Sequence, residues 1–417
     1  MNRIILVGNG FDLAHNLPTK YEDFINWYSH ERFISLENNN TQMSADQLCT
    51  LHLCICAVYD DLYWNSSRNL TQYYEKFRNC KTWHDFYIEN STGKYKGHID
   101  LLHNDFKILS NNNSVIYSVK CSHLFENITK SIETTGWVDI ENEYYNFLRS
   151  FLSEKKYNNP KQLNDELDFI RTKLIEYLTL VQDKYINEGI INEEIGKKIT
   201  EPFNKKDLSN ETFEYFKKVR KIAPFKSNKE TEDYIFSKTG QASPENILIL
   251  DFNYTKTADL YLTKRPYIKI KHIHGDLENS DSVIFGYGDE LDRDYKELSR
   301  LNNNELLRNI KSIKYLESSN YRSILSFIGW EKFQIYIMGH SCGNSDRTLL
   351  NTLFEHENCA SIKPFYHKSK NGKDNYLDIV QNISRNFTDM KLMRDRVVNK
   401  EFCEPLPQNN STKKQEI

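Results

Sequence analysis

The sequence predicts an α/β fold in which a parallel sheet is interrupted by a large, mainly helical insertion. A short apolar run at residues 4–7 leads directly into a glycine turn. Further apolar runs at 246–251, 268–273 and 334–338 end in polar or glycine residues, with helical stretches between them. Strands that alternate with helices are typical of a parallel α/β sheet.

The first predicted strand, residues 4–7, contains β-branched and apolar side chains that suit a buried strand. Gly8-Asn9-Gly10-Phe11-Asp12 follows at once, and two glycines allow a close approach of the backbone to a ligand. A helix is predicted from Tyr21. Such a strand, turn and helix start can turn backbone N–H groups toward a phosphate, so residues 8–11 are predicted ligand contacts. Leu13 stands where the usual dinucleotide fingerprint has Gly or Ala, and a plain tight turn is the alternative.

Length, charge and composition limit the classes of protein to which the chain can belong. The 417 residues can bury a large core, and the net charge of -3 gives no basic field that would attract nucleic acid. We see no secretory leader and no apolar stretch near the roughly 20 residues that span a bilayer, so we expect a cytoplasmic protein. The eight cysteines include no Cys-x-x-Cys pair, so we expect reduced thiols and predict no metal site.

Residues 31–244 are poor in glycine and proline and form the predicted insertion. Apolar residues at helical spacing predict helices at 47–64, 163–185, 190–199 and 211–222. The runs near 106–108 and 115–119 are ambiguous between helix and strand.

A motif inside this segment, Trp137-Val138-Asp139-Ile140-Glu141, places two carboxylates two residues apart. One of them, Asp139 or Glu141, is a secondary candidate for lining a nucleotide cleft. The alternative is an ordinary helix start, where acidic residues are favoured by the helix dipole.

The rest of the sheet is predicted in the C-terminal half, with strands at 246–251, 268–273, 283–285, 334–338 and 361–366. We therefore predict a discontinuous core made of residues 1–30 and 245–400, and a loose tail at 401–417. Ligands of open α/β sheets bind outside the carboxyl ends of the strands, where the polar residues of this chain stand.

The run from Gly8 to Tyr21 resembles the opening of the bacteriophage abortive-infection family AbiH, which itself resembles the NAD-binding core of sirtuins. Sirtuins open with a strand, Gly-Ala-Gly-x-Ser and then Gly-Ile-Pro. Asp12 falls where the serine stands, and Asn16 replaces a glycine, a mild change because Asn tolerates left-handed backbone. The resemblance implies a Rossmann-like, sirtuin-like sheet. A carboxylate repels pyrophosphate, so we expect Asp12 to face a ribose or the scissile end of the ligand.

Three later segments extend the resemblance. Asn253 in Asp-Phe-Asn-Tyr-Thr matches the asparagine of the sirtuin Thr-Gln-Asn-Ile-Asp, and His274-Gly275 resembles the sirtuin His-Gly. Gly339-His340-Ser341, with Asp346, resembles the late Gly-Thr-Ser segment that contacts ribose and phosphate. The resemblance implies that Asn253 and His274 act on the nicotinamide ribose, and that Gly275, Gly339, Ser341 and Asp346 help to bind NAD. The Trp-x-Asp-x-Glu run at 137–141 also resembles a run of the abortive-infection family.

The implied reaction is hydrolysis of NAD at the nicotinamide–ribose bond, which passes through an oxocarbenium-like state. His274 is the expected base, Asn253 the group that holds water or a ribose hydroxyl, and Asp12 an assisting carboxylate. His272, two residues away, is the alternative active histidine. The zinc module of sirtuin deacetylases is absent from the sequence, so water is the expected acceptor. The implied role is anti-phage defence, with a phage-derived trigger or partner protein and a homo-oligomer as further expectations.

Three other interpretations remain open. Gly339-His340-Ser341-Cys342-Gly343 matches the nucleophile elbow of serine esterases, with Asp346 or Asp374 and His356 or His367 as partners. The core could instead be a nucleotide sensor or scaffold without turnover. The acidic cluster Asp289, Glu290, Asp292 and Asp294 suggests a metal nuclease, or a solvated loop before a helix.

Overall fold

The computed structural model describes residues 1–38, 43–55, 107–111, 115–135, 139–152, 159–186, 191–209, 211–212, 214–215, 242–262, 266–288 and 291–409. The contacts within the chain define two compact units, one made of Met1–Thr19 and Leu178–Ile417 and the other of Lys20–Tyr177. The domain boundaries that the sequence predicts, near 30 and 245, stay a prediction.

The first unit contains the parallel sheet and most of the helices. Its strands are β1 (Asn2–Val7), β6 (Ile247–Asp251), β7 (Ile268–His272), β8 (Phe333–Met338) and β9 (Cys359–Phe365). Its helices are α1 (Asn9–Ala14), α9 (Glu193–Thr200), α12 (Arg293–Arg300), α13 (Lys311–Lys314), α14 (Asn320–Trp330), α15 (Arg347–Phe354), α16 (Tyr376–Asn386) and α17 (Met390–Arg396). Helix α8 (Pro160–Tyr185) runs from the second unit into the first.

The sheet has five parallel strands in the order β7-β6-β1-β8-β9. The chain first builds outward from β1 through β6 to β7, and then returns to the other side of β1 for β8 and β9. The α/β fold with a parallel sheet is therefore confirmed. The order of the strands reverses between β1 and β8, and this is where open α/β sheets leave a crevice at their carboxyl edge.

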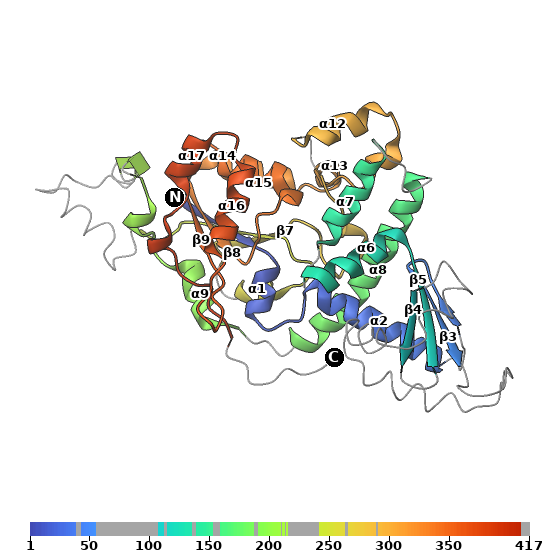
Figure 1. Ribbon diagram of the computed structural model, residues 1–417. Helices are drawn as coiled ribbons and strands as arrows, with labels where there is room; N and C mark the ends of the chain where they lie inside the picture. The colour runs from blue at the N-terminus through green and yellow to red at the C-terminus, as the bar shows by residue number, and fades with distance from the viewer. Residues whose placement is uncertain are drawn as a thin grey trace, which may run out of the picture. The chain divides into compact units, whose positions relative to one another are not determined.

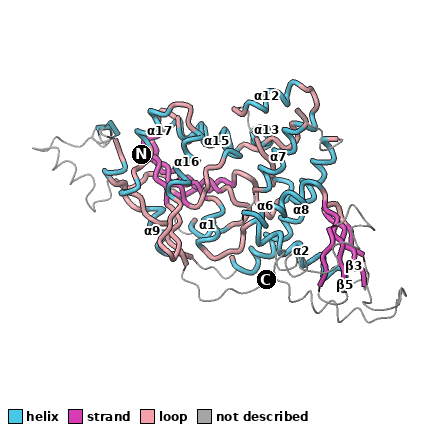
Figure 2. The backbone as a smooth tube through the Cα atoms, in the orientation of Figure 1, coloured by secondary structure: helices cyan, strands magenta, loops and turns pink. Residues whose placement is uncertain are grey.

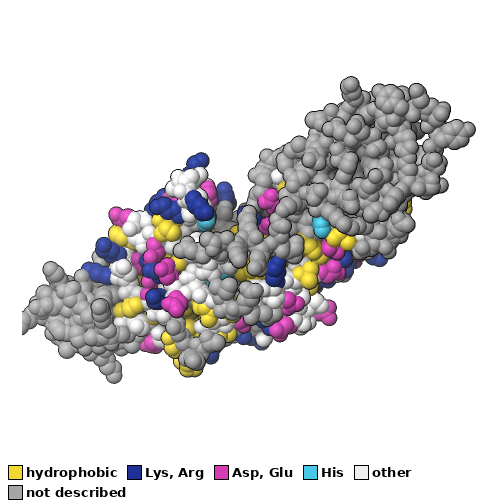
Figure 3. All heavy atoms as spheres, turned by 90° about the horizontal axis from the view of Figure 1, so that it is seen from below, with side chains coloured by type: hydrophobic (Ala, Val, Ile, Leu, Met, Phe, Trp, Pro, Cys, Tyr) yellow, Lys and Arg dark blue, Asp and Glu magenta, His cyan; other side chains and the backbone are white. Residues whose placement is uncertain are grey.

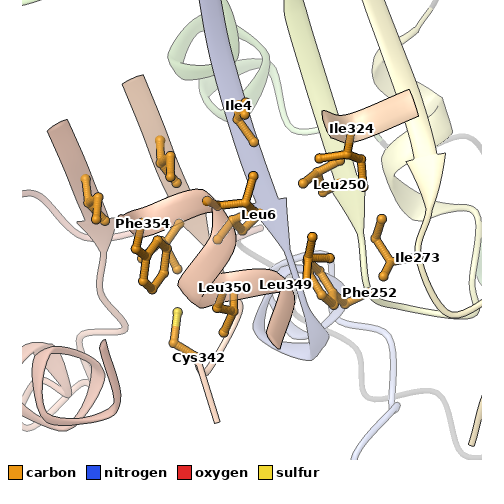
Figure 4. Close-up of a cluster of buried hydrophobic side chains, with 14 of the residues drawn as sticks. Ile4, Leu6, Leu250, Phe252, Ile273, Ile324, Cys342, Leu349, Leu350 and Phe354 are labelled. Atoms are coloured by element: carbon orange, nitrogen blue, oxygen red, sulfur yellow. The ribbon is translucent and has the colours of Figure 1, made fainter. Parts of the chain in front are cut away.

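Alternating residues of β1 face opposite sides of the sheet, because side chains of a strand alternate. Ile4 and Leu6 pack with α14, α15 and α16, and Ile5 and Val7 pack with α1 and α9. Figure 1 shows α14 to α17 on one side of the sheet and α1 and α9 on the other. In Figure 4 the side chains of α15 meet those of β1 and β6 in the first of these cores. Both faces of the sheet are thus covered, and only its edges and ends can hold a ligand.

The structure confirms most of the strands predicted for this sheet and corrects one. Residues 283–285 do not form a strand. Their side chains are buried, but the segment has a single backbone bond to the neighbouring strand end, from the Ile284 N–H to the His274 carbonyl at 2.9 Å. The apolar run indicates burial, and too few ladder bonds form to make a strand.

The second unit contains α2 (Tyr21–Asn38), α6 (His123–Thr135), α7 (Ile140–Ser150) and a four-stranded antiparallel sheet. The strands are β2 (Met43–Ala45), β3 (Cys49–Ile55), β4 (Lys107–Asn111) and β5 (Val115–Cys121), in the order β2-β3-β5-β4. Figure 2 distinguishes these strands from the helices by colour. The predicted helix at 47–64 is wrong over 49–55, because Leu51, Leu53 and Ile55 recur every second residue, the period of a strand. Residues 56–64 lie outside the described residues.

Two further predicted helices are confirmed, as α8 and α9, and that at 211–222 lies mostly outside the described residues. The first nine residues of the predicted loose tail are packed. Leu406 is buried and donates its N–H to the Tyr366 carbonyl, and the Asn409 N–H bonds to the carbonyl of Ala14. Residues 410–417 lie outside the part of the chain that the structure describes.

Candidate functional site

Four of the predicted segments meet at the carboxyl edge of the parallel sheet. Gly8 follows β1, Asn253 follows β6, His274 follows β7 and Gly339 follows β8. The edge is a single surface because parallel strands all end on the same side. Sequence-distant residues thus form one cluster in the first unit, at the position where the strand order reverses.

The glycine turn after β1 packs directly against the loop after β8. The Gly10 N–H donates to the Gly339 carbonyl at 2.9 Å. A Cβ atom on Gly339 would lie 2.1 Å from the Phe11 nitrogen, and Gly339 has a φ of +82°. The glycines therefore permit two loops to touch. The predicted phosphate-binding role of residues 8–11 stays a prediction, and the Gly10 N–H must leave Gly339 to serve it.

A Gly339→Ala variant is expected to lose about 3 kcal/mol or more of unfolding free energy, because overpacking adds to the cost of left-handed backbone. Gly372 is the matched control: its φ is +86°, and a Cβ there would meet no atom within 4 Å. Gly372→Ala should cost only about 1 kcal/mol. Chemical denaturation of both variants measures the difference. Equal losses would show that the contact between the two loops is not tight.

Phe11 and Gly275, both predicted NAD contacts, pack closely against other residues of the protein. Phe11 is buried, and its ring lies 4.7 Å from that of His15 and 5.7 Å from that of Tyr261, measured between centroids. Gly275 has a φ of +80°, and a Cβ there would lie 2.2 Å from the Ser282 carbonyl oxygen. The packing explains both residue types without a ligand. Asn16, likewise, has a φ of +65°, as its replacement of a glycine suggests.

Asn253 connects the ends of two neighbouring strands. Its side-chain Nδ2 donates to the Gly8 carbonyl at 3.1 Å, and its backbone N–H donates to Oδ1 of Asp251 at 3.0 Å. The side chain is nearly buried, and it fixes the glycine turn relative to β6. A group held this firmly is suited to positioning a ligand at the edge of the sheet.

Asp12 is one of the buried carboxyl groups near this edge of the sheet, with 1% of its surface exposed. Thr255 Oγ1 donates to its Oδ2 at 2.7 Å, whereas its Oδ1 makes no hydrogen bond to any described residue. Burial raises the pKa of Asp12 to about 7, although hydrogen bonding from Thr255 and Thr257 acts in the opposite direction. A carboxyl with this pKa exchanges protons near neutral pH, as a general acid or base must.

His274 belongs to a buried network of charged and polar groups. Its Nε2 lies 2.9 Å from Oδ1 of Asp346, and the Lys311 Nζ lies 3.2 Å from the same oxygen. The hydroxyl of Tyr315 donates to this oxygen at 3.3 Å. Burial alone would raise the pKa of Asp346, but the charge of Lys311 and the hydrogen bonds from histidine hold it well below its usual range. Asp346 is therefore ionised, and Lys311 is its nearest cation.

Burial and the positive charge of Lys311 lower the pKa of His274, which favours a neutral ring. Its Nε2 faces Asp346 and its Nδ1 lies 3.2 Å from the Phe252 carbonyl oxygen. Both nitrogens thus face protein atoms. The expected role of His274 as a base stays a prediction, and it requires the ring to break one of these contacts.

His272, the alternative histidine, lies between two other carboxylates. Its Nδ1 is 3.3 Å from Oδ2 of Asp251, and its Nε2 is 3.2 Å from Oδ2 of Asp259. Burial would lower the pKa of His272, but the two carboxylates raise it to about 10, and burial raises the pKa of Asp251 to about 6. His272 and His274 therefore lie in different environments, although two residues separate them.

Ser341 does not have the surroundings of an esterase nucleophile. Its side chain is exposed, and no hydrogen bond to its Oγ from a histidine exists among the described residues. Of the predicted triad partners, His356 packs against Phe333 at the start of β8, whereas Ser341 follows the end of that strand. The backbone carbonyl of Ser341 accepts from Asn382 at 2.8 Å.

The remaining acidic candidates have local roles. Asp139, in the second unit, caps α7 by accepting from the Asn142 N–H at 3.0 Å, and Glu141 is buried in the first turn of that helix. Asp292 caps α12 through the Asp294 N–H. Asp289 and Glu290 lie outside the described residues. The helix-start interpretations are therefore confirmed for Asp139 and Asp292, and the prediction that Asp139 or Glu141 lines a nucleotide cleft stays a prediction.

Among the helices that the structure describes, none is long and apolar enough to cross a membrane. On the face drawn in Figure 3, acidic and basic side chains are interspersed, in keeping with the small net charge. The absence of a nucleic-acid partner stays a prediction.

A family model described as "Bacteriophage abortive infection AbiH" matches residues 4–367. The matched range includes the whole cluster, from Gly8 to Asp346. Searches of curated proteins and of solved structures found no match.

Proposed function

Because the chain belongs to the bacteriophage abortive infection AbiH family, we propose that it acts in anti-phage defence by hydrolysing NAD at the nicotinamide–ribose bond. Loss of NAD would stop the growth of an infected cell. The observation that carries the proposal is the meeting of Asp12, Asn253 and the loop after β8 at the carboxyl edge of the sheet.

The strand order supports a Rossmann-like core. Numbered along the chain, β1, β6, β7, β8 and β9 are strands 1 to 5, so the order β7-β6-β1-β8-β9 is 3-2-1-4-5. This is the order of the first five strands of the doubly wound dinucleotide-binding sheet, whose ligands lie where the order reverses. In this chain that position lies between Gly8–Gly10 and Gly339.

The chemistry of the cluster suits this reaction. Nicotinamide leaves as a neutral group, so the protein must chiefly hold the ribose and activate a water molecule. Asn253, fixed to Gly8, would orient a ribose hydroxyl or the water. Asp12 has a pKa of about 7 and an oxygen that makes no hydrogen bond to the described residues, so its carboxylate would accept the water's proton or stabilise the oxocarbenium-like state.

The test is release of nicotinamide from NAD by the purified full chain. We expect Asn253→Ala and His274→Ala each to lower turnover by about 100-fold or more. His356→Ala, a partly exposed histidine beside Phe333, is the control and should leave turnover unchanged. Turnover that survives Asn253→Ala would reject the proposed site.

A second candidate is a sensor that binds NAD without turnover. It is favoured by one observation, that both nitrogens of His274 face protein atoms. Calorimetric titration with NAD separates the two candidates. Binding without nicotinamide release, also in the presence of phage extract, would support the sensor.

A further inference from the structure

Three ligand-type side chains converge beside the proposed NAD site. Asp251 and His272 are paired across β6 and β7 in the parallel register, so their side chains share one face of the sheet. Asp259 comes from the short 3-10 helix Thr257–Tyr261 that follows β6. One ligand atom from each residue lies within 4.8 Å of those of the other two.

The facing atoms of this trio make no hydrogen bonds. Oδ2 of Asp251, Oδ2 of Asp259 and Nδ1 of His272 are all buried and without a hydrogen-bond partner among the described residues. Only 1% of the Asp251 side chain is exposed. Buried polar atoms are rarely left in this condition, and an ion that is held there is one of the recognised explanations.

The distances within the trio are longer than those of well-aligned charged hydrogen bonds. An N–H donor aligned with a carboxylate usually lies about 2.7–2.9 Å from it. Here Oδ2 of Asp251 lies 3.3 Å from Nδ1 of His272 and Oδ2 of Asp259 lies 3.2 Å from its Nε2, and neither pair is aligned for a hydrogen bond. One ion binds only one of the two ring nitrogens, so only one of these pairs can have the spacing of two ligands of a tetrahedral zinc ion, about 3.3 Å for bonds of about 2.0–2.1 Å. The ligand atom of the third residue lies within 4.8 Å of the other two.

The surroundings resemble those of metal ligands in general. Oδ1 of Asp251 accepts from the Asn253 N–H at 3.0 Å, which turns Oδ2 toward the trio. The carbonyl of His272 accepts from Asn320 at 2.9 Å, which fixes the end of β7. Such contacts orient ligands in metal sites. The side chains of His272 and Asp259 are 18% and 33% exposed, so water can complete the coordination.

We propose that Asp251, Asp259 and one ring nitrogen of His272 bind a divalent transition-metal ion such as Zn²⁺, with water at the remaining positions. Imidazole and carboxylate ligands suit this class of ion. The proposal does not depend on NAD hydrolysis, because none of the three ligands is a residue proposed to act on NAD, although Asp251 accepts a hydrogen bond from the Asn253 N–H. The sequence predicts no metal, since the three ligands are spread over two strands and a connection.

The experiment is titration of the full chain with Zn²⁺ by calorimetry after removal of metals with a chelator. We expect one ion per chain, and an affinity at least about 10–100-fold lower for Asp259→Asn and for His272→Gln. His356→Ala is the control, because His356 packs against Phe333 at the start of β8, away from the trio at the carboxyl ends of β6 and β7. Co²⁺ provides a second readout, since visible absorption bands of tetrahedral Co²⁺ should appear in the wild type and the control only.

Two results would overturn the proposal. One is the absence of stoichiometric binding, or binding that both variants retain. The other is a nitrogen NMR spectrum in which both ring nitrogens of His272 stay protonated with Zn²⁺ in excess, because His272 would then be an imidazolium ion paired with two carboxylates. Circular dichroism of each variant excludes misfolding as the cause of lost binding.

Discussion

A Lys311→Met variant is expected to lose about 3–5 kcal/mol of unfolding free energy at neutral pH, because removal of one partner leaves a buried charge without its counterion. Lys311 is 1% exposed and its Nζ lies 3.2 Å from Oδ1 of Asp346. Asp346 is itself buried, and its pKa is well below its usual range. Methionine keeps most of the volume and apolar length of lysine, so the loss reports the charge.

A double-mutant cycle measures this interaction by chemical denaturation. Asp346→Asn and Lys311→Met should each be destabilising, and the double variant should be far more stable than the sum of the two losses predicts. Lys314 lies on the same helix as Lys311 and forms an exposed ion pair with Glu317 of the 3-10 helix that follows. Lys314→Met is therefore the matched control and should change stability by less than about 1 kcal/mol. Additive losses would show that Lys311 and Asp346 do not stabilise each other.

The sequence predicts the parallel sheet well because four of its five strands, β1, β6, β8 and β9, are buried on both faces and are therefore mainly apolar runs. Four of the five predicted C-terminal strands, at 246–251, 268–273, 334–338 and 361–366, form as β6 to β9. The run at 283–285 is equally apolar, but burial alone does not supply hydrogen-bonding neighbours. The four-stranded sheet of the second unit is missed because β3 pairs with β5, which lies some sixty residues further along the chain. Local patterns do not identify such partners.

The sequence also places Asp12, Asn253, His274 and Asp346 near the carboxyl edge of the sheet, since each follows a strand. It does not predict which groups these side chains contact. Lys311 gives no signal, because it is one of many lysines and lies on a short helix. Its importance comes from burial against Asp346, which depends on the tertiary fold. The sequence predicts that the glycines at 10 and 339 approach a ligand, and in the structure they approach each other. A pair of glycines indicates that the backbone approaches another group closely, but it does not identify that group.

The raised pKa of Asp12 should make the stability of the protein depend on pH. The pKa of this carboxyl is raised from 3.8 to about 7, so the folded protein binds this proton more tightly than the unfolded chain does. The contribution of Asp12 to stability should therefore fall as the pH rises from about 4 to 7, by about 4 kcal/mol in total, and should stay constant above pH 7. Asp12→Asn removes the charge and should make the protein more stable than the wild type at pH 8.

The same substitution should lower NAD turnover by about 10²–10⁴-fold, because an amide cannot take a proton from water. Wild-type turnover should rise as the pH increases through about 7, the value at which Asp12 ionises.

Asp281→Asn is the control for both predictions. Asp281 is an exposed carboxyl in the 3-10 helix Ser280–Ser282, and its substitution should alter neither stability nor turnover. Nicotinamide release and urea denaturation between pH 5 and 9 measure both effects. A variant that gains stability at pH 8 but keeps its turnover would show that Asp12 is a buried acid without a catalytic role. A variant that loses turnover without gaining stability would show that its carboxyl is ionised at little cost, in contradiction to its burial.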